Sequence, residues 1–177
     1  MMKRALPTLV VAFASVAANA AQAQDASPCG VDHAAWFALH AEEMTGTWTD
    51  TPVMGLLLGQ PMPLGPPEPV QMTAIPDGFS TVGEDPVRVY DLVLTDGPFM
   101  VDPPGGAGAL ARLDRETITD CPIADLPRLS SSYTIEIDGE MVEGNIAAVV
   151  QSTRVMHIWF ALDTSFGRVE QMSTLTR

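Results

Sequence analysis

The feature that most constrains the fold is a series of four segments in the last third of the chain, at residues 131–138, 141–151, 154–162 and 168–176. In the first of them apolar and polar side chains alternate, in the order Tyr133, Thr134, Ile135, Glu136, Ile137. Successive side chains of a β-strand point to opposite faces, so this spacing predicts a strand with one apolar face. Asp138-Gly139 is a strong hairpin signal, and the later connections are also short. The four segments therefore predict an antiparallel meander.

Shorter extended runs precede this meander. The clearest is 87–95, which places Tyr90, Leu92 and Leu94 on one face. The others are 46–49, 70–75, 78–82, 99–101 and 109–113. So many short strands with so little helix predict a mainly β domain, in which the antiparallel meander forms a barrel or, alternatively, a sandwich.

One N-terminal helix is expected at residues 32–44. Asp32 can cap its start and Gly46 can end it. Apolar side chains recur at helical spacing between these two residues, so one face of the helix is expected to pack on the sheet.

Residues 51–69 are rich in proline and glycine. Proline removes a backbone donor and fixes φ, so the segment is predicted to be neither a helix nor a central strand. It also contains Leu56, Leu57 and Met62. An apolar loop must cover something, so we expect a flap that folds over the domain.

The N-terminus has the three-part pattern of a secretory signal. Lys3 and Arg4 form a basic start, residues 6–18 are apolar, and Ala21-Gln22-Ala23 supplies a cleavage site. A membrane anchor is the alternative, but this apolar core is shorter than the ~20 residues that span a bilayer. We expect residues 1–23 to be a signal peptide and residues 24–177 to be a single domain in the periplasm, or secreted, without a stable membrane span.

The strong negative charge of the chain excludes some classes of binding partner. Removing Lys3 and Arg4 from the nine basic residues leaves seven, all arginine, against 22 acidic residues, which is a formal net charge of −15. Such a surface repels nucleic acid and anionic lipid. It suits a cationic partner, a metal ion or solubility alone. Without lysine, the processed domain cannot form a Schiff base.

The two cysteines, Cys29 and Cys121, are predicted to form a disulfide, because an even pair in an oxidising compartment is usually oxidised. The alternative, a thiolate metal or redox site, lacks a Cys-x-x-Cys motif.

The order of elements resembles a lipocalin or the wider calycin family. The resemblance depends on Gly46-Thr47-Trp48 on the first strand, followed by a long loop and an antiparallel meander that ends in an arginine. It implies that Trp48 closes one end of a barrel and that Arg177, or less directly Arg168, packs over it. It also implies that residues 51–69 form a lid over the other end.

Family members commonly bind small apolar molecules inside the barrel, and this is the function that the resemblance implies here. The expected lining is Leu56, Leu57, Met62, Tyr90, Leu92, Tyr133, Ile135, Met156, Ile158 and Phe160. The alternative function is a periplasmic interaction or accessory factor that docks another protein through the apolar flap and the acidic surface.

Metal binding of a copper type is a third hypothesis. His40 and Met44 share a face of the expected helix, and His157 lies on a late strand, so the three could supply nitrogen and sulfur ligands. The alternative is that they pack the helix on the sheet.

No Gly-x-Ser-x-Gly motif, the mark of a nucleophilic serine, is present. The sequence therefore identifies no catalytic residue and no cofactor, and it leaves enzyme activity open while favouring a binding protein.

Overall fold

The computed structural model describes residues 27–83, 89–96, 121–137 and 139–177. The predicted signal peptide and the expected runs 99–101 and 109–113 lie outside them. Within the described residues the elements are the helix α1 (His33–His40), the short 3-10 helix η3 (Ile123–Asp125) and the strands β1 (Gly46–Leu57), β2 (Gln60–Pro61), β3 (Glu68–Ile75), β4 (Gly78–Val82), β5 (Val89–Leu94), β6 (Arg128–Ile137), β7 (Glu140–Ser152), β8 (Val155–Thr164) and β9 (Gly167–Thr176). No helix of the described segments is long and apolar enough to span a membrane.

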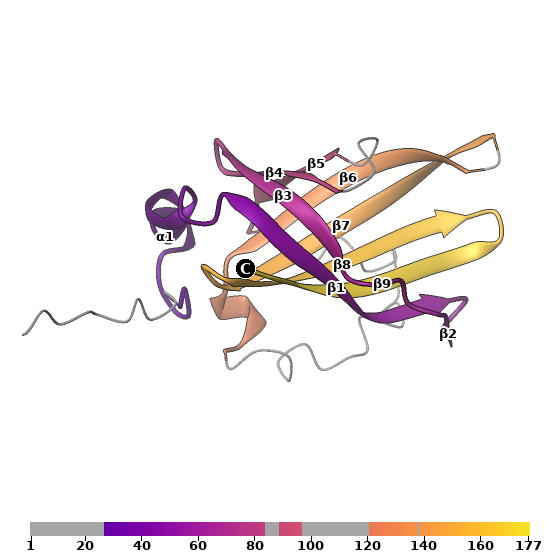
Figure 1. Cartoon of the computed structure of the whole chain (residues 1–177), viewed down its shortest axis with the longest axis horizontal. Coiled ribbons are helices and arrows are strands. Elements are labelled where there is room, and N and C mark those ends of the chain that lie inside the picture. Colours follow the sequence, from indigo (N-terminus) through magenta and orange to yellow (C-terminus); the bar gives the residue numbers. More distant parts are fainter. Residues whose placement is uncertain (1–26, 84–88, 97–120, 138) are drawn as a thin grey trace, which may run out of the picture.

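The strands form a closed antiparallel barrel (Figure 1). From β3 to β9 each strand pairs with the next one along the chain, and β1 pairs with both β3 and β9. β2 is only a two-residue extension on the end of β1. The prediction of a mainly β barrel is confirmed, and the sandwich alternative is wrong.

The expected loop at 51–69 begins later than predicted. β1 continues to Leu57, and its second half pairs with β9. Pro52 is tolerated because the register with β9 shifts between Pro52 and Met54, and proline within sheets is confined largely to such bulges and to edges. The prediction that the whole segment lacks strand structure is therefore wrong for its first seven residues, and also for the short β2 and for the first two residues of β3.

The bulge also changes which side chains point inward. Before it, Trp48 belongs to the core inside the barrel and Asp50 lines the interior. After it, Met54 and Leu56 pack against a second cluster on the outer face. An irregularity of one residue in a period of two exchanges the faces of everything that follows.

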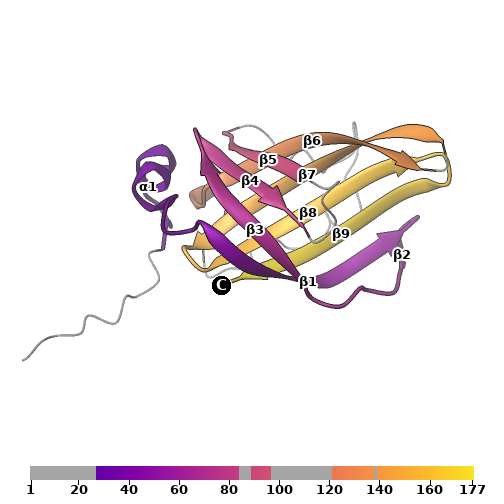
Figure 2. The same cartoon turned by 45° about the horizontal axis from the view of Figure 1, so that its top comes forward.

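α1 lies across one end of the barrel, here called the closed end (Figure 2). Asp32 caps it as expected, by accepting a hydrogen bond of 2.9 Å from the Ala35 amide. The Phe37 ring packs 4.8 Å from the Phe79 ring of β4. The helix ends at His40, not at residue 44, because residues 41–44 form a turn. Leu39, expected on the apolar side, is 75% exposed.

The disulfide between Cys29 and Cys121 is confirmed. It joins the segment before α1 to the segment before β6, which are 92 residues apart in sequence. Beside it the Gly30 amide donates a hydrogen bond of 3.0 Å to the carbonyl of Asp125. The crosslink therefore holds the closed end to η3.

Two apolar clusters hold the barrel together. The inner one includes Trp36, Phe37 and Met44 from the α1 region, with Trp48, Met72, Phe79, Leu92, Leu129, Ile146, Met156, Ile158 and Leu175. The outer one consists of Ala147, Val149, Trp159, Ala161 and Met172, packed with Met54, Leu56 and Ile123. β7 contributes to both clusters, so residues 146–150 are apolar and buried without alternation.

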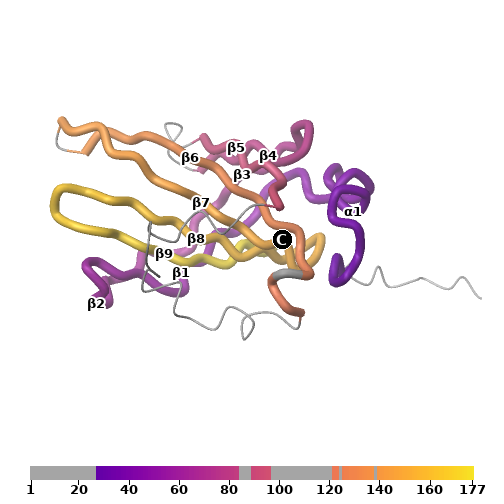
Figure 3. Tube along the Cα trace, turned by 180° about the vertical axis from the view of Figure 1, so that it is seen from behind, coloured from indigo at the N-terminus to yellow at the C-terminus, as the bar shows by residue number. Residues whose placement is uncertain are grey.

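At the end away from α1, here called the open end, the β6–β7 and β8–β9 hairpins extend beyond β3, β4 and β5 (Figure 3). The segment between β1 and β3, residues 58–67, which includes β2, is anchored at this end on glycines. A Cβ atom on Gly55 would lie 2.8 Å from Cγ of Met62, and one on Gly167 would collide with the Leu58 side chain. The lack of side chains at these two positions lets the loop pack closely.

Candidate functional site

A cavity of about 280 Å³ lies inside the barrel. Its lining comes mostly from the parts of the strands toward the open end, and consists of Asp50, Val70, Thr81, Gly83, Tyr90, Tyr133, Ile135, Ile158, Phe160, Leu162, Val169, Gln171 and Leu175. Small-molecule sites are commonly apolar hollows of about 300–1,000 Å³ with a few placed polar groups. This cavity is at the lower limit of that range and has the same character.

Three aromatic rings form one wall of the cavity. Tyr90 of β5 packs 5.0 Å from Tyr133 of β6 and 6.3 Å from Phe160 of β8, measured between ring centroids. Tilted pairs at these separations are favourable arrangements of aromatic rings. The strands hold these residues on inward-facing positions, so the wall is part of the barrel.

The position of the Tyr133 ring requires a glycine on the neighbouring strand. It lies directly opposite Gly144 in the β6–β7 register. A Cβ atom on Gly144 would be 2.6 Å from Oη and 2.7 Å from Cε1 of the tyrosine. The ring can therefore pack closely over β7.

The opposite wall, formed by β1 and β9, carries the polar side chains of Asp50 and Gln171 beside the apolar Val169 and Leu175. Asp50 is half-buried and lies within reach of the Ser173 hydroxyl, and the Gln171 amide donates a hydrogen bond of 3.3 Å to Oγ of the same serine. Burial is the main cause that raises the pKa of the Asp50 carboxyl. The hydrogen bond from Ser173 opposes this shift, and the negative charge of Glu68 adds to it.

Five of the predicted lining residues line the cavity: Tyr90, Tyr133, Ile135, Ile158 and Phe160. Leu92 and Met156 also point inward but are fully buried in the core.

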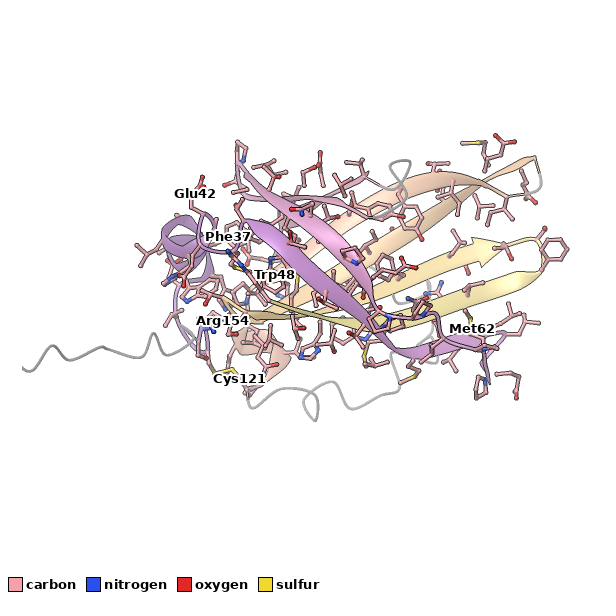
Figure 4. All side chains as sticks on the ribbon, in the orientation of Figure 1. Phe37, Glu42, Trp48, Met62, Cys121 and Arg154 are labelled. Carbon is pink, nitrogen blue, oxygen red and sulfur yellow. A yellow bond between two sulfur atoms is a disulfide. The ribbon has the colours of Figure 1, made fainter. Side chains whose placement is uncertain are left out.

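The three residues expected from the flap lie elsewhere. Leu56 packs in the outer cluster because the β1 bulge turned it outward. Leu57 is exposed opposite Val169, and Met62 packs over Gly55 (Figure 4 shows Met62 far from Trp48 and Phe37). None of them lines the cavity, so their assignment to its lining is not supported by the geometry.

Sequence reasoning missed the polar residues of the lining and some of the apolar ones. Leu162, Val169 and Leu175 lie on strands that were predicted, and alternation from their neighbours could have found them. Asp50 follows Trp48 by two residues on the same strand, which places both on one face. The proline-rich composition that starts at residue 51 hid this continuation.

The closed end contains the residues implied by the calycin resemblance. Trp48 is buried and its indole N–H donates a hydrogen bond of 2.8 Å to the carbonyl of Met44. The Arg177 guanidinium lies against Gly46, 3.5 Å from where a Cβ atom would be, and donates to the Glu43 carbonyl. Arg168 instead pairs with Glu170 at 2.8 Å and with Asp163 at 2.9 Å. Of the two arginines, only Arg177 lies beside the Gly-x-Trp strand.

The residues considered for a metal have other contacts. Nδ1 of His40 lies 3.2 Å from a carboxylate oxygen of Glu43, and Met44 is buried in the inner cluster. His157 bonds to Gln151 at 2.8 Å and to Thr174 at 3.2 Å on the outer face, and burial lowers the pKa of its imidazole. In the described segments, no group of three or more His, Cys, Asp or Glu side chains is placed to hold a metal ion.

Comparison with known proteins does not identify a family for this chain. No protein-family model matches the chain, and neither a curated protein nor a solved structure matches it significantly.

Proposed function

We propose that the barrel binds a small, mainly apolar ligand in its cavity. The observation that carries the proposal is the lining itself: a hollow of about 280 Å³ walled mainly by aromatic and aliphatic side chains, with few polar groups among them. Apolar surface that a ligand transfers from water into this hollow contributes about 25 cal/mol per Å², before the costs of ordering.

We further propose that the protein is a calycin-type barrel. The placement of Trp48 at the closed end, with Arg177 beside Gly46, supports this relationship. So does the closed antiparallel barrel. An ion pair or cofactor is not needed for this mode of binding, because the barrel walls supply the contacts.

We also propose that the domain is exported. The Cys29–Cys121 disulfide fits an oxidising compartment, where such bonds persist. Intact mass of the protein from a periplasmic extract should show a chain that starts near Gln24 and has no free thiol. A mass that includes residues 1–23, or alkylation of both cysteines without reductant, would contradict export.

The binding proposal can be tested with the apolar fluorescent probe phenylnaphthylamine. The wild-type domain should enhance its fluorescence in a saturable titration. Ile135→Trp fills the cavity and should abolish the enhancement, whereas Thr134→Trp places the same ring on the exposed face of β6 and should not. Equal binding by the two variants would show that the probe does not enter the barrel.

A second candidate function is docking of another periplasmic protein at the open end. Leu58, Met141 and Phe166 are 63%, 64% and 69% exposed there, an apolar surface that isolated domains usually limit. In this case Phe166→Asp should abolish a complex recovered from periplasmic extract and leave probe binding unchanged. If it instead impairs only the probe titration, the rim serves ligand entry.

A further inference from the structure

We propose that the ligand is an amphiphile with a hydrogen-bond-donating head, an amine or a hydroxyl, which the Asp50 carboxylate receives inside the barrel. This inference rests on the proposed function, because it names the class of ligand for the same cavity. It is carried by where Asp50 lies and by what its two oxygens contact.

Asp50 is the one charged side chain among the described residues that line the cavity. It is on the same face of β1 as Trp48, the residue at the closed end. It pairs with Leu175 in the β1–β9 register, six residues along β9 from Val169, which is nearer the open end. Six residues of strand span roughly 20 Å, so Asp50 lies well below the end of the long β8–β9 hairpin, while on its other side it pairs with Glu68, where the shorter strand β3 begins.

The neighbouring side chains leave one carboxylate oxygen without a donor. A serine hydroxyl has one proton to donate, so Ser173 can satisfy at most one of the two carboxylate oxygens of Asp50. Gln171 also lines the cavity, and its side-chain amide donates to Ser173. Oδ1 of Asp50 is shielded from solvent and accepts no hydrogen bond from the residues that the structure describes.

An unsatisfied buried acceptor is costly, and native proteins usually supply a partner for it. Asp50 lines the cavity, and the last torsion of an aspartate side chain is soft, so the carboxylate can turn to meet a donor on a bound ligand. A donor on a bound ligand would complete the set of hydrogen bonds. Because burial also raises the pKa of this carboxyl, an ammonium head would stabilise its ionised form.

The same arrangement disfavours an acidic ligand. A fatty acid would bring a second carboxylate against Asp50, and no described lining residue carries a positive charge to offset it. The field of the whole chain, with a formal net charge of −13, further repels anions and attracts cations. The tail would lie toward the open end, against apolar residues such as Ile135, Phe160 and Leu162.

The test uses three amphiphiles that share one tail: decylamine, decanol and decanoate. Calorimetric titration of the wild-type domain should give the tightest binding for decylamine, weaker binding for decanol, and binding about tenfold or more weaker than the amine for decanoate. Asp50→Asn keeps the shape of the side chain and should remove most of the amine's advantage. The control Asp91→Asn removes the same charge from the exposed face of β5, and it should preserve the order of affinities.

The outcomes separate this inference from the proposed function. If phenylnaphthylamine binds but the three amphiphiles bind equally, or decanoate binds best, the role of Asp50 is wrong and the apolar cavity stands. If Asp50→Asn and Asp91→Asn reduce amine binding equally, the amine is held by overall charge, which also overturns the inference. If neither the probe nor any amphiphile binds, both proposals fail.

Discussion

Gly144→Ala is a small change with a large expected effect on the cavity wall. The new Cβ atom would lie 2.6 Å from Oη and 2.7 Å from Cε1 of Tyr133, whereas ordinary contacts are 3.4–4 Å. The ring must therefore move by about 1 Å, which disturbs its packing 5.0 Å from Tyr90. The backbone of Gly144 does not have a positive φ, so alanine adds no backbone strain.

The size of the effect follows from these contacts. Overpacking of a filled site costs about 1–3 kcal/mol, and a lost aromatic pair costs about 0.5–1.5 kcal/mol. Replacing glycine offsets about 0.4–1 kcal/mol by restricting the unfolded chain. With each contribution at the middle of its range, Gly144→Ala should therefore lower the free energy of unfolding by about 2 kcal/mol, which corresponds to several degrees in Tm for a domain of this size.

Urea denaturation measures this difference, with Gly65→Ala as the matched control. A Cβ atom on Gly65 would have no neighbouring atom within 4 Å, so alanine there should be neutral or slightly stabilising. Gly144→Ala should also weaken phenylnaphthylamine binding, because the displaced ring enters the cavity. If the two variants are equally stable and bind the probe equally, Tyr133 does not lie over Gly144 and the description of this wall is wrong.

Other consequences can be measured independently. Ile135→Asp should lower the free energy of unfolding by more than about 2 kcal/mol and Thr134→Asp by less than about 0.5 kcal/mol, and equal effects would refute the β6 register. Reduction of Cys29–Cys121 should destabilise the domain by up to about 4–5 kcal/mol, since it opens a loop of 92 residues, and an unchanged urea midpoint would contradict that contribution. Burial lowers the pKa of His157 below 6.5, so the folded state binds this proton less readily than the unfolded state. The stabilising contribution of neutral His157 is complete above pH 6.5 and is lost as the pH falls through the folded pKa. His157→Gln should remove this pH-dependent loss of stability. If the variant and the wild type lose stability with pH in the same way, His157 is not its source.

The meander could be predicted because its signals are local. Strict alternation in residues 131–137 and the Asp138-Gly139 turn define β6 and its partner without knowledge of the rest of the chain. β4 was predicted with its observed bounds, Gly78–Val82, between two turn-forming sequences. Five of the ten residues predicted to line the cavity do so, because inward-facing positions follow directly from this alternation.

The features that could not be predicted from the sequence depend on interactions between residues far apart in the chain. β1 continues past Pro52 because β9, at the other end of the chain, supplies a partner and the bulge accommodates the proline. The same bulge turned Leu56 outward, and no pattern within residues 51–57 shows where the register shifts. The polar part of the lining has the same origin, since Asp50 meets Ser173 only when β1 and β9 close the barrel.

Methyl NMR during a titration with decanol tests the central claim, that the inside of the barrel binds an apolar ligand, most directly. Ile135 and Ile158 line the cavity, whereas Ile123 packs against the outer cluster and serves as an internal control. Saturable shifts of the Ile135 and Ile158 methyl signals, with an unchanged Ile123 signal, are the predicted result. Shifts confined to Ile123, or no shifts at any of the three, would contradict the account.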